Sequence, residues 1–195
     1  MSSEGTLLAG IFIGGRAVRM AGRAKGLLKT PSSNENLVER LRRITSEALP
    51  GTPLVLVGQH SAYEHLELEQ LADAPEAQGP RAGLLALCRS AERRGRRQVL
   101  ALACDLPYLS ASLLGRLAGH APEAAAVAPL IDERYQPFCA RYDAELTRRC
   151  ILADRQHPDG GLQAVLRQLG ATTLPLDAGA ASELRDWDTP EDIES

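Results

Sequence analysis

The chain alternates between short apolar runs and longer amphipathic segments. Residues 6–13 form a nearly continuous apolar run that Gly14-Gly15 closes. Because this run is too short for a typical helix, it predicts a strand buried on both faces. Apolar residues at helical spacing follow in 36–48 and predict an amphipathic helix: Leu37, Val38, Leu41 and Ile44. The apolar run at 54–57 predicts a second strand, which completes a β-α-β unit.

The alternation continues along the chain. We expect a helix over 82–94, a strand over 99–103 and a helix that Ser110 caps. Apolar runs at 124–130 and 138–142, separated by a turn at 132–134, predict an antiparallel pair. Helical spacing returns at 144–153 and 161–169, and a helix start is expected at Thr189-Pro190. The expected fold is a three-layer α/β/α, Rossmann-like arrangement whose central sheet is mostly parallel with an antiparallel addition.

Composition and charge narrow the function. A chain of 195 residues that is 44% hydrophobic suits a single domain over 1–195. Its net charge of -3 gives no overall reason to bind nucleic acid or an anionic membrane. The basic run over 89–97 lacks interleaved aromatic residues, so it is interpreted as a solvated helix end, with a partner-binding patch as the alternative. The first residues lack a basic region followed by a long apolar stretch, and no apolar run approaches the ~20 residues that a membrane span needs. We therefore expect a cytoplasmic protein.

Cysteine and histidine spacing argues against a zinc site or a disulfide framework. The four cysteines are scattered without a C-x-x-C pair and are expected to be reduced core thiols: Cys88, Cys104, Cys139 and Cys150. The four histidines lack metal-ligand spacing and are expected at the surface or in packing contacts.

The most informative segment runs from the first strand to Gly26. It is a loop with several glycines and four cations, Arg16, Arg19, Arg23 and Lys25. Such a loop can bring backbone amides to phosphate oxygens while its cations neutralise their charge. It matches neither the P-loop nor the dinucleotide fingerprint. Phosphate binding is therefore one interpretation, and a glycine loop without a ligand is the other.

Asp105 is the strongest single candidate for chemistry. It follows the apolar strand at 99–103 directly, and open α/β sheets bind ligands at the carboxyl ends of their strands. A carboxylate there is a hard oxygen donor that suits Mg²⁺. A turn or cap role before Pro107 is the alternative interpretation.

Five motifs in order resemble one known family. They are Gly14-Gly15 with Arg19-Met20, Gly22 and Lys25-Gly26; Asp73 with Gly79-Pro80-Arg81-Ala82-Gly83; Cys104-Asp105-Leu106-Pro107; Gln136-Pro137-Phe138 leading to Ala140-Arg141-Tyr142; and the segment 186–192. Together they resemble the molybdenum cofactor guanylyltransferases, the MobA-type members of the nucleotidyltransferase superfamily. The resemblance extends over nearly the whole chain.

The resemblance implies a reaction and a set of site residues. The reaction is transfer of GMP from MgGTP to the phosphate of molybdopterin, with release of pyrophosphate. Asp105 would bind Mg²⁺, and Lys25 and Arg19 would act in catalysis. The remaining nucleotide contacts would come from Phe12, Ile13, Gly14, Gly15 and Asp73, with Lys25 also on phosphate.

The sequence departs from the family pattern at a few positions. Ile13 stands where relatives usually have alanine, and Ala24 where they usually have aspartate. Asp186 and Asp188 match the related cytidylyltransferases. The first alternative is therefore a molybdopterin cytidylyltransferase or another NTP transferase of the superfamily, and the second is a catalytically weak nucleotide-binding module. The expected partners are the two substrates and molybdoenzymes or their chaperones, with the chain itself a monomer.

Overall fold

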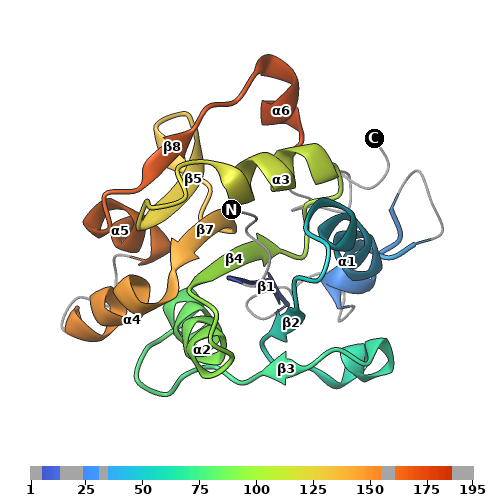
Figure 1. Ribbon diagram of the computed structural model, residues 1–195. Coiled ribbons are helices and arrows are strands. Elements are labelled where there is room, and N and C mark those ends of the chain that lie inside the picture. The colour runs from blue at the N-terminus through green and yellow to red at the C-terminus, as the bar shows by residue number, and fades with distance from the viewer. Residues whose placement is uncertain (1–5, 14–23, 31–34, 155–160, 186–195) are drawn as a thin grey trace.

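A central sheet organises the fold (Figure 1). The computed structural model describes residues 6–13, 24–30, 35–154 and 161–185. Their strands follow the order β3-β2-β1-β4-β7-β5-β6, and β8 pairs with β5. The strands are β1 (Leu7–Phe12), β2 (Leu54–Val57), β3 (Gln70–Leu71), β4 (Gln98–Ala103), β5 (Ala126–Ile131), β6 (Arg134–Tyr135), β7 (Cys139–Asp143) and β8 (Thr172–Leu174).

Strand direction agrees with the sequence-based prediction. β1 lies in parallel pairing between β2 and β4, with Phe12 opposite Val57 on one side and Ala103 on the other. All six residues of β1 are buried, as expected for a strand covered on both faces. β7 runs antiparallel between β4 and β5, and it includes most of the predicted strand 138–142. The mostly parallel sheet with an antiparallel addition is therefore confirmed.

Helices cover both faces of the sheet and make three layers (Figure 1). One face packs against α1 (Leu37–Ala48), α3 (Ala111–Gly119) and α6 (Ala178–Ser182), and the other against α2 (Pro80–Arg93), α4 (Ala144–Ala153) and α5 (Gly161–Gln168). The alternation of β1 explains the division, because Ala9 and Ile11 join the first hydrophobic cluster and Leu8 and Phe12 the second.

Local sequence signals set most helix boundaries. Asn36 caps α1 with a full capping box to Glu39, and the Ser110 side chain accepts from the Leu113 amide at the start of α3. The expected helix 82–94 begins earlier, at Pro80, since proline suits the first helical position. The expected strand 124–130 is shifted to 126–131, and the helix expected at Thr189-Pro190 lies outside the described residues.

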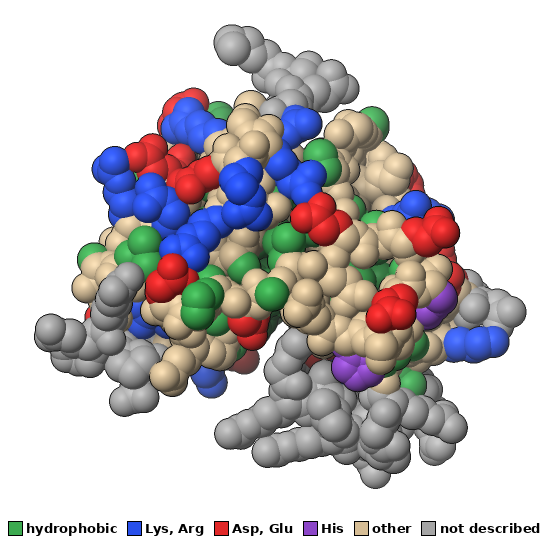
Figure 2. All heavy atoms as spheres, turned by 90° about the horizontal axis from the view of Figure 1, so that it is seen from below, with side chains coloured by type: hydrophobic (Ala, Val, Ile, Leu, Met, Phe, Trp, Pro, Cys, Tyr) green, Lys and Arg blue, Asp and Glu red, His purple; other side chains and the backbone are tan. Residues whose placement is uncertain are grey.

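Arginines of the basic run at the end of α2 form ion pairs with acids from other segments. Arg89 pairs with Glu76, Arg94 with Glu69, and Arg97 with Glu123 and Asp143. Figure 2 shows Lys and Arg side chains gathered beside Asp and Glu on this side of the molecule. Acids of the same chain therefore largely neutralise the charge of these three arginines, which agrees with a solvated helix end.

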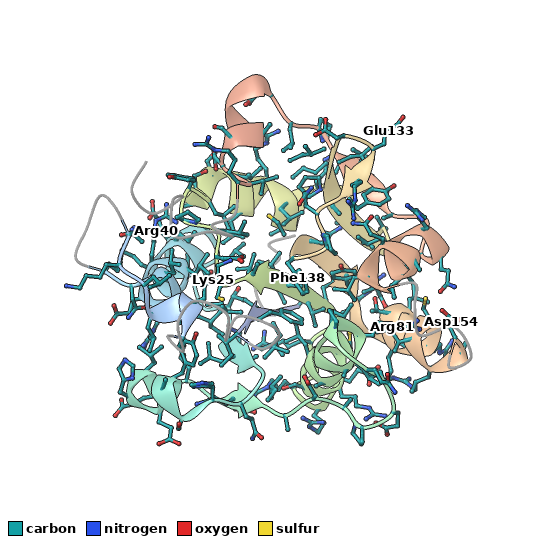
Figure 3. All side chains as sticks on the ribbon, turned by 180° about the vertical axis from the view of Figure 1, so that it is seen from behind. Lys25, Arg40, Arg81, Glu133, Phe138 and Asp154 are labelled. Atoms are coloured by element: carbon teal, nitrogen blue, oxygen red, sulfur yellow. The ribbon has the colours of Figure 1, made fainter. Side chains whose placement is uncertain are left out.

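A buried arginine joins α2 to α4. The Arg81 guanidinium donates to the Asp154 carboxylate at 3.1 Å and to the Ile151 carbonyl at 3.3 Å (Figure 3). Arg81 belongs to the motif that ends at Gly83, and its contacts satisfy carbonyl groups at the end of α4. This arginine therefore fixes the start of α2 against a helix some 70 residues away in the chain.

Three of the four cysteines are core thiols, as predicted. Cys88, Cys104 and Cys139 are buried and free, and burial is the main cause that raises the pKa of Cys104 and of Cys139 to about 12. The prediction was wrong for Cys150, which is only half-buried because α4 presents it beside α5, where its Sγ donates to Gln168 Oε1. Among the described residues, no helix is long and apolar enough to cross a membrane.

The β5–β6 turn carries backbone strain. Asp132 and Glu133 connect the two strands with φ of 47° and 60°, a conformation that favours glycine. Glu133 is exposed (Figure 3). Glu133→Gly is expected to raise the free energy of unfolding by about 0.5–1 kcal/mol in urea denaturation, because relief of the strain exceeds the added entropy of the unfolded chain.

Glu133→Ala is the matched control for that variant. It removes the same side chain but keeps a Cβ in the left-handed region, so its stability should stay at the parent value. Equal stabilities of the glycine and alanine variants would show that the turn is not strained.

Candidate active site

Lys25 and Asp105 form a shielded ion pair. Lys25 Nζ lies 2.7 Å from Asp105 Oδ2, and the two side chains are 8% and 19% exposed. They are separated by 80 positions in the chain. The fold brings the two side chains into direct contact, because opposite charges removed from most of the solvent attract strongly.

The sheet places Asp105. β4 runs parallel to β1 with Ala103 opposite Phe12, and the Cys104 amide donates to the Phe12 carbonyl at 3.3 Å. Asp105 is the next residue, so its carboxylate leaves the sheet at the carboxyl ends of the two central strands. β2 and β3 are added on one side of β1, and β4 is added on the other, so the direction of strand addition reverses between β1 and β4. Open α/β sheets generally bind ligands at such a point.

A short 3-10 helix, η2 (Lys25–Leu27), places Lys25. The Gly26 amide donates to the Tyr63 hydroxyl at 3.1 Å. A Cβ on Gly26 would lie 2.7 Å from Val38 Cγ2 and 2.9 Å from Tyr63 Oη, so only glycine fits without a shift of α1 or of η3 (Ser61–Leu66), which carries Tyr63. Gly26 therefore lets η2, the turn that carries the Lys25 cation, pack closely against α1 and η3.

Tyr63 is a positioning residue that sequence reasoning missed. Its side chain is buried, and burial is the main cause that raises its pKa to about 12. The hydroxyl therefore stays protonated at neutral pH while it accepts from Gly26. The sequence offered no signal for it, because Tyr63 lies in a polar segment between two strands and acts only through a contact 37 positions away.

Because the sequence predicts MgGTP as the ligand, Tyr63→Phe is expected to weaken MgGTP binding by several-fold. It should also lower stability by about 1–2 kcal/mol, because it leaves the buried Gly26 amide without an acceptor. Calorimetric titration and urea denaturation measure the two effects. Tyr142→Phe is the control, since it loses a buried hydrogen bond to the Pro137 carbonyl elsewhere in the core. It should cost similar stability and leave MgGTP affinity unchanged; a similar loss of affinity in both variants would contradict a positioning role for Tyr63.

At the carboxyl end of β1, the side chains of Phe12 and Ile13 are buried in the core and the peptide groups lie at the edge of the sheet. Ile13 is 5% exposed and packs in the cluster of α1 and α3, so its bulk points away from the edge of the sheet. The Ile13 amide donates to the Val57 carbonyl at 3.0 Å, and the Phe12 carbonyl accepts from Cys104. Among the described residues the Ile13 carbonyl has no such partner, so it can accept a hydrogen bond from a ligand.

The Gly-Pro-Arg-Ala-Gly motif brings α2 close to the sheet. A Cβ on Gly83 would lie 2.9 Å from Phe12 Cε1 and from Val57 Cγ1. Asp73 precedes this helix at the carboxyl end of β3, is exposed, and its neighbour Ala74 donates to the Ala82 carbonyl at 3.2 Å. Asp73 therefore lies at the same edge of the sheet, two strands from β1, and forms no hydrogen bond or ion pair with Lys25 or Asp105.

Several predicted site residues lie outside the described part of the chain. They are Gly14, Gly15, Arg19, Asp186 and Asp188.

The donor set at Asp105 fits a magnesium ion shared with substrate. Asp105 Oδ1 has no hydrogen-bond partner among the described residues, so one carboxylate oxygen remains for a metal. Within the described ranges, no group of three His, Cys, Asp or Glu side chains could hold an ion by itself. Mg²⁺ commonly takes one or two carboxylates and completes its shell with phosphate oxygens and water. Lone Asp105 is compatible with that mode and not with a closed protein site.

A cavity of about 450 Å³ opens beside the β5–β6 turn. Its apolar lining includes Ile131, Phe138 and Leu162, and its polar lining includes Arg134 and Gln163. Gln163 Nε2 donates to the Tyr135 carbonyl at 2.5 Å, while its Oε1 is buried without a hydrogen-bond partner. Phe138 joins the cavity to the end of β1, because its ring lies 4.9 Å from that of Phe12 and its carbonyl accepts from Ala103.

Comparison with known proteins identifies the family. Residues 9–173 match the family model described as the MobA-like NTP transferase domain. The chain belongs to this family. The matched range includes both Lys25 and Asp105, together with the cavity beside Phe138. The chain is thus a nucleotidyltransferase by family membership.

Curated relatives of this MobA-like chain share modest identity. It is 27% identical over 197 residues to a protein of Opitutus terrae named "probable molybdenum cofactor guanylyltransferase", covering 98% of this chain and 96% of the relative. A protein of Clostridium perfringens with the same name is 25% identical over 134 residues, covering 69% of this chain and 64% of the relative.

Solved structures confirm the nucleotidyltransferase fold. Molybdopterin-guanine dinucleotide biosynthesis protein A from Archaeoglobus fulgidus superposes with a TM-score of 0.70 at 18% identity, covering 95% of this chain and 94% of that one. The 2-C-methyl-D-erythritol 4-phosphate cytidylyltransferase of Thermus thermophilus superposes with a TM-score of 0.65 at 14% identity, covering 96% and 95%. At these identities the likeness concerns the fold alone.

Proposed function

We propose that the protein transfers GMP from MgGTP to the phosphate of molybdopterin, releasing pyrophosphate and forming the guanine dinucleotide cofactor. The observation that carries the proposal is the Lys25–Asp105 pair, 2.7 Å apart at the carboxyl ends of the central strands. A cation and a carboxylate at that position are what a metal-bound polyphosphate requires. The names of the Opitutus and Clostridium relatives support the choice of nucleotide and acceptor.

In the proposed reaction an oxygen of the acceptor phosphate attacks the α-phosphorus of GTP directly. A new phosphorus–oxygen bond forms, and the bond to the bridging oxygen of the β-phosphate breaks, so pyrophosphate leaves with the electron pair. Catalysis then rests on positioning two anions and neutralising their charge. Cys104 beside the site remains a thiol at neutral pH, since burial and then the Asp105 charge raise its pKa to about 12, so no covalent step is assigned to it.

The residues have distinct roles in this proposal. Lys25 and Arg19 neutralise phosphate charge, and Asp105 would hold Mg²⁺. When bound, this metal ion would offset negative charge on the phosphate oxygens. Asp73, with the backbone of Phe12, Ile13, Gly14 and Gly15, would contact the nucleotide.

We assign the acceptor to the cavity beside Phe138. Its apolar walls can enclose a flat ring system, and the Gln163 side chain adds a polar amide to the lining. Arg134 adds a cation for an anionic group. The contact between Phe138 and Phe12 connects this cavity to the edge of the sheet where Asp105 lies.

Pyrophosphate release tests the proposal when it is measured with GTP, CTP, ATP and UTP, each with and without molybdopterin. We expect release only with acceptor present and fastest with GTP. A preference for CTP would instead make the protein a cytidylyltransferase. MgGTP binding in a calorimeter without pyrophosphate release would identify a nucleotide-binding module that lacks transferase activity.

A further inference from the structure

Arg40 lies in α1, and the start of this helix is hydrogen-bonded to the segment that carries Lys25. Arg40 follows the cap residue Asn36 by one turn. The Leu37 amide donates to the Leu28 carbonyl at 3.1 Å, and Lys29 and Asn36 form a β-bridge, so the start of α1 is tied to the end of η2. Figure 3 shows Arg40 and Lys25 on these neighbouring segments. Arg40 therefore lies near the end of α1 that is joined to the turn of Lys25.

One nitrogen of the Arg40 guanidinium lacks a hydrogen-bond partner. Its side chain is partly buried, and its Nη1 is buried without a hydrogen-bond partner. Loss of hydration lowers the pKa of Arg40, and the positive charge of Arg43 lowers it further. By contrast, Arg81 and Arg148 each donate to a carboxylate within 3.1 Å. A desolvated guanidinium that lacks such a contact costs stability, which favours binding of an anion.

The two acids whose charge acts on Arg40 already have other partners. Glu183 and Glu35 attract Arg40 only at longer range. Glu183 Oε2 accepts from the Ser110 amide at 2.9 Å, and Glu35 is paired with Arg43 at 3.1 Å. Neither carboxylate can move to Arg40 without giving up that contact. The missing partner is therefore expected to come from a bound ligand.

The position of Glu183 locates Arg40 relative to Asp105. Ser110, which Glu183 contacts, follows Asp105 by five residues in the turn that leads from β4 to α3. On the same turn, Tyr108 lies under the guanidinium of Arg185, 5.5 Å from its ring centroid. The turn that begins with Asp105 is thus contacted by Lys25, by Arg185 and by Glu183, whose charge also acts on Arg40. The positive charges of Lys25 and Arg185 at this turn suit a ligand with several negative charges.

We propose that Arg40 binds the pyrophosphate portion of the nucleoside triphosphate, the group that leaves in the transfer. The assignment rests on the proposed function, and it adds a residue from α1 that none of the five sequence motifs includes. A planar guanidinium can donate two parallel hydrogen bonds to phosphate oxygens, which an ammonium cannot. The side chain is only partly buried, so such a ligand can reach it.

Calorimetric titration with inorganic pyrophosphate, GTP and GMP, each with Mg²⁺, tests the assignment in the full chain. Arg40→Ala is expected to weaken pyrophosphate and GTP binding by at least about tenfold, as for loss of a charge-assisted contact, and to leave GMP binding within about twofold. Arg40→Lys should recover only part of the loss, because it restores the charge without the paired donors.

Arg42→Ala is the matched control. Arg42 lies two positions further along α1, is exposed, and donates to the Leu66 carbonyl at 3.5 Å. The variant removes an equal charge and leaves the pair of Arg43 and Glu35 intact, so all three affinities should be unchanged. Thermal unfolding of each variant checks that the fold is retained.

Two results would overturn the role of Arg40. One is an unchanged affinity of Arg40→Ala for pyrophosphate, and the other is an equal loss for GMP and GTP, which would indicate a general effect on the site. Failure of the parent protein to bind either GTP or pyrophosphate would refute the proposed function itself. The two failures are therefore distinguishable.

Discussion

Replacing Lys25 with methionine is expected to lower kcat/KM by about 10²–10³, as for loss of a single electrostatic donor to the transition state. Methionine keeps the apolar stem of the side chain, so the variant should fold. Asp105 loses its described counter-ion but is 19% exposed and can be hydrated, which limits the loss of stability to about 1 kcal/mol. Pyrophosphate release under kcat/KM conditions gives the kinetic effect.

Lys29→Met is the control for the Lys25 variant. Lys29 is exposed and lies four residues further along the same segment, so the substitution changes net charge equally. It should keep kcat/KM within about twofold, as expected for a surface change. If both variants lost kcat/KM to a similar extent, the overall positive charge of the segment would assist the reaction, and the Lys25 ammonium would have no specific role.

Asp105→Asn is expected to have the larger kinetic effect, at least about 10³ in kcat/KM, because it removes the proposed metal ligand as well as the partner of Lys25. It should also cost more stability than Lys25→Met, about 2 kcal/mol. The reason is that the ammonium it leaves without this carboxylate is only 8% exposed and is poorly hydrated. Kinetics at several Mg²⁺ concentrations and urea denaturation measure the two effects.

Glu123→Gln is the control for Asp105→Asn. It neutralises an acid that is 81% exposed and pairs with Arg97 away from the site, so activity should be retained. If Asp105→Asn kept the parent dependence on Mg²⁺, the carboxylate would not be the metal ligand. If it were as stable as the parent, the ion pair would contribute nothing to the fold.

The sequence predicted the elements whose burial follows a clear period. The strand over 54–57 and the helix over 144–153 have the predicted boundaries, and the helix over 36–48 differs by a single residue. β3 and β8 were missed because two and three residues are too few to show a period, and because pairing with neighbouring strands defines them. The short α6 was missed for a similar reason.

The site was only partly predictable. Lys25 and Asp105 could be named because each follows a recognisable pattern, and the parallel order of β1 and β4 brings them together. Tyr63 and Arg40 could not be named, since their importance depends on a hydrogen bond and on desolvation that exist only after packing. The contact between the chain's two phenylalanines, Phe12 and Phe138, is likewise a product of β7 inserting beside β4.

The central claim is that Lys25 and Asp105 share one metal-bound triphosphate. Crystals grown with GTP and Mn²⁺ in place of Mg²⁺ test it most directly, since the anomalous signal of manganese locates the ion. The account predicts manganese at coordination distance from the Asp105 carboxylate and from phosphate oxygens, with Lys25 Nζ in contact with the same phosphates. An ion and triphosphate bound away from Asp105, with the 2.7 Å Lys25–Asp105 contact unchanged, would contradict it.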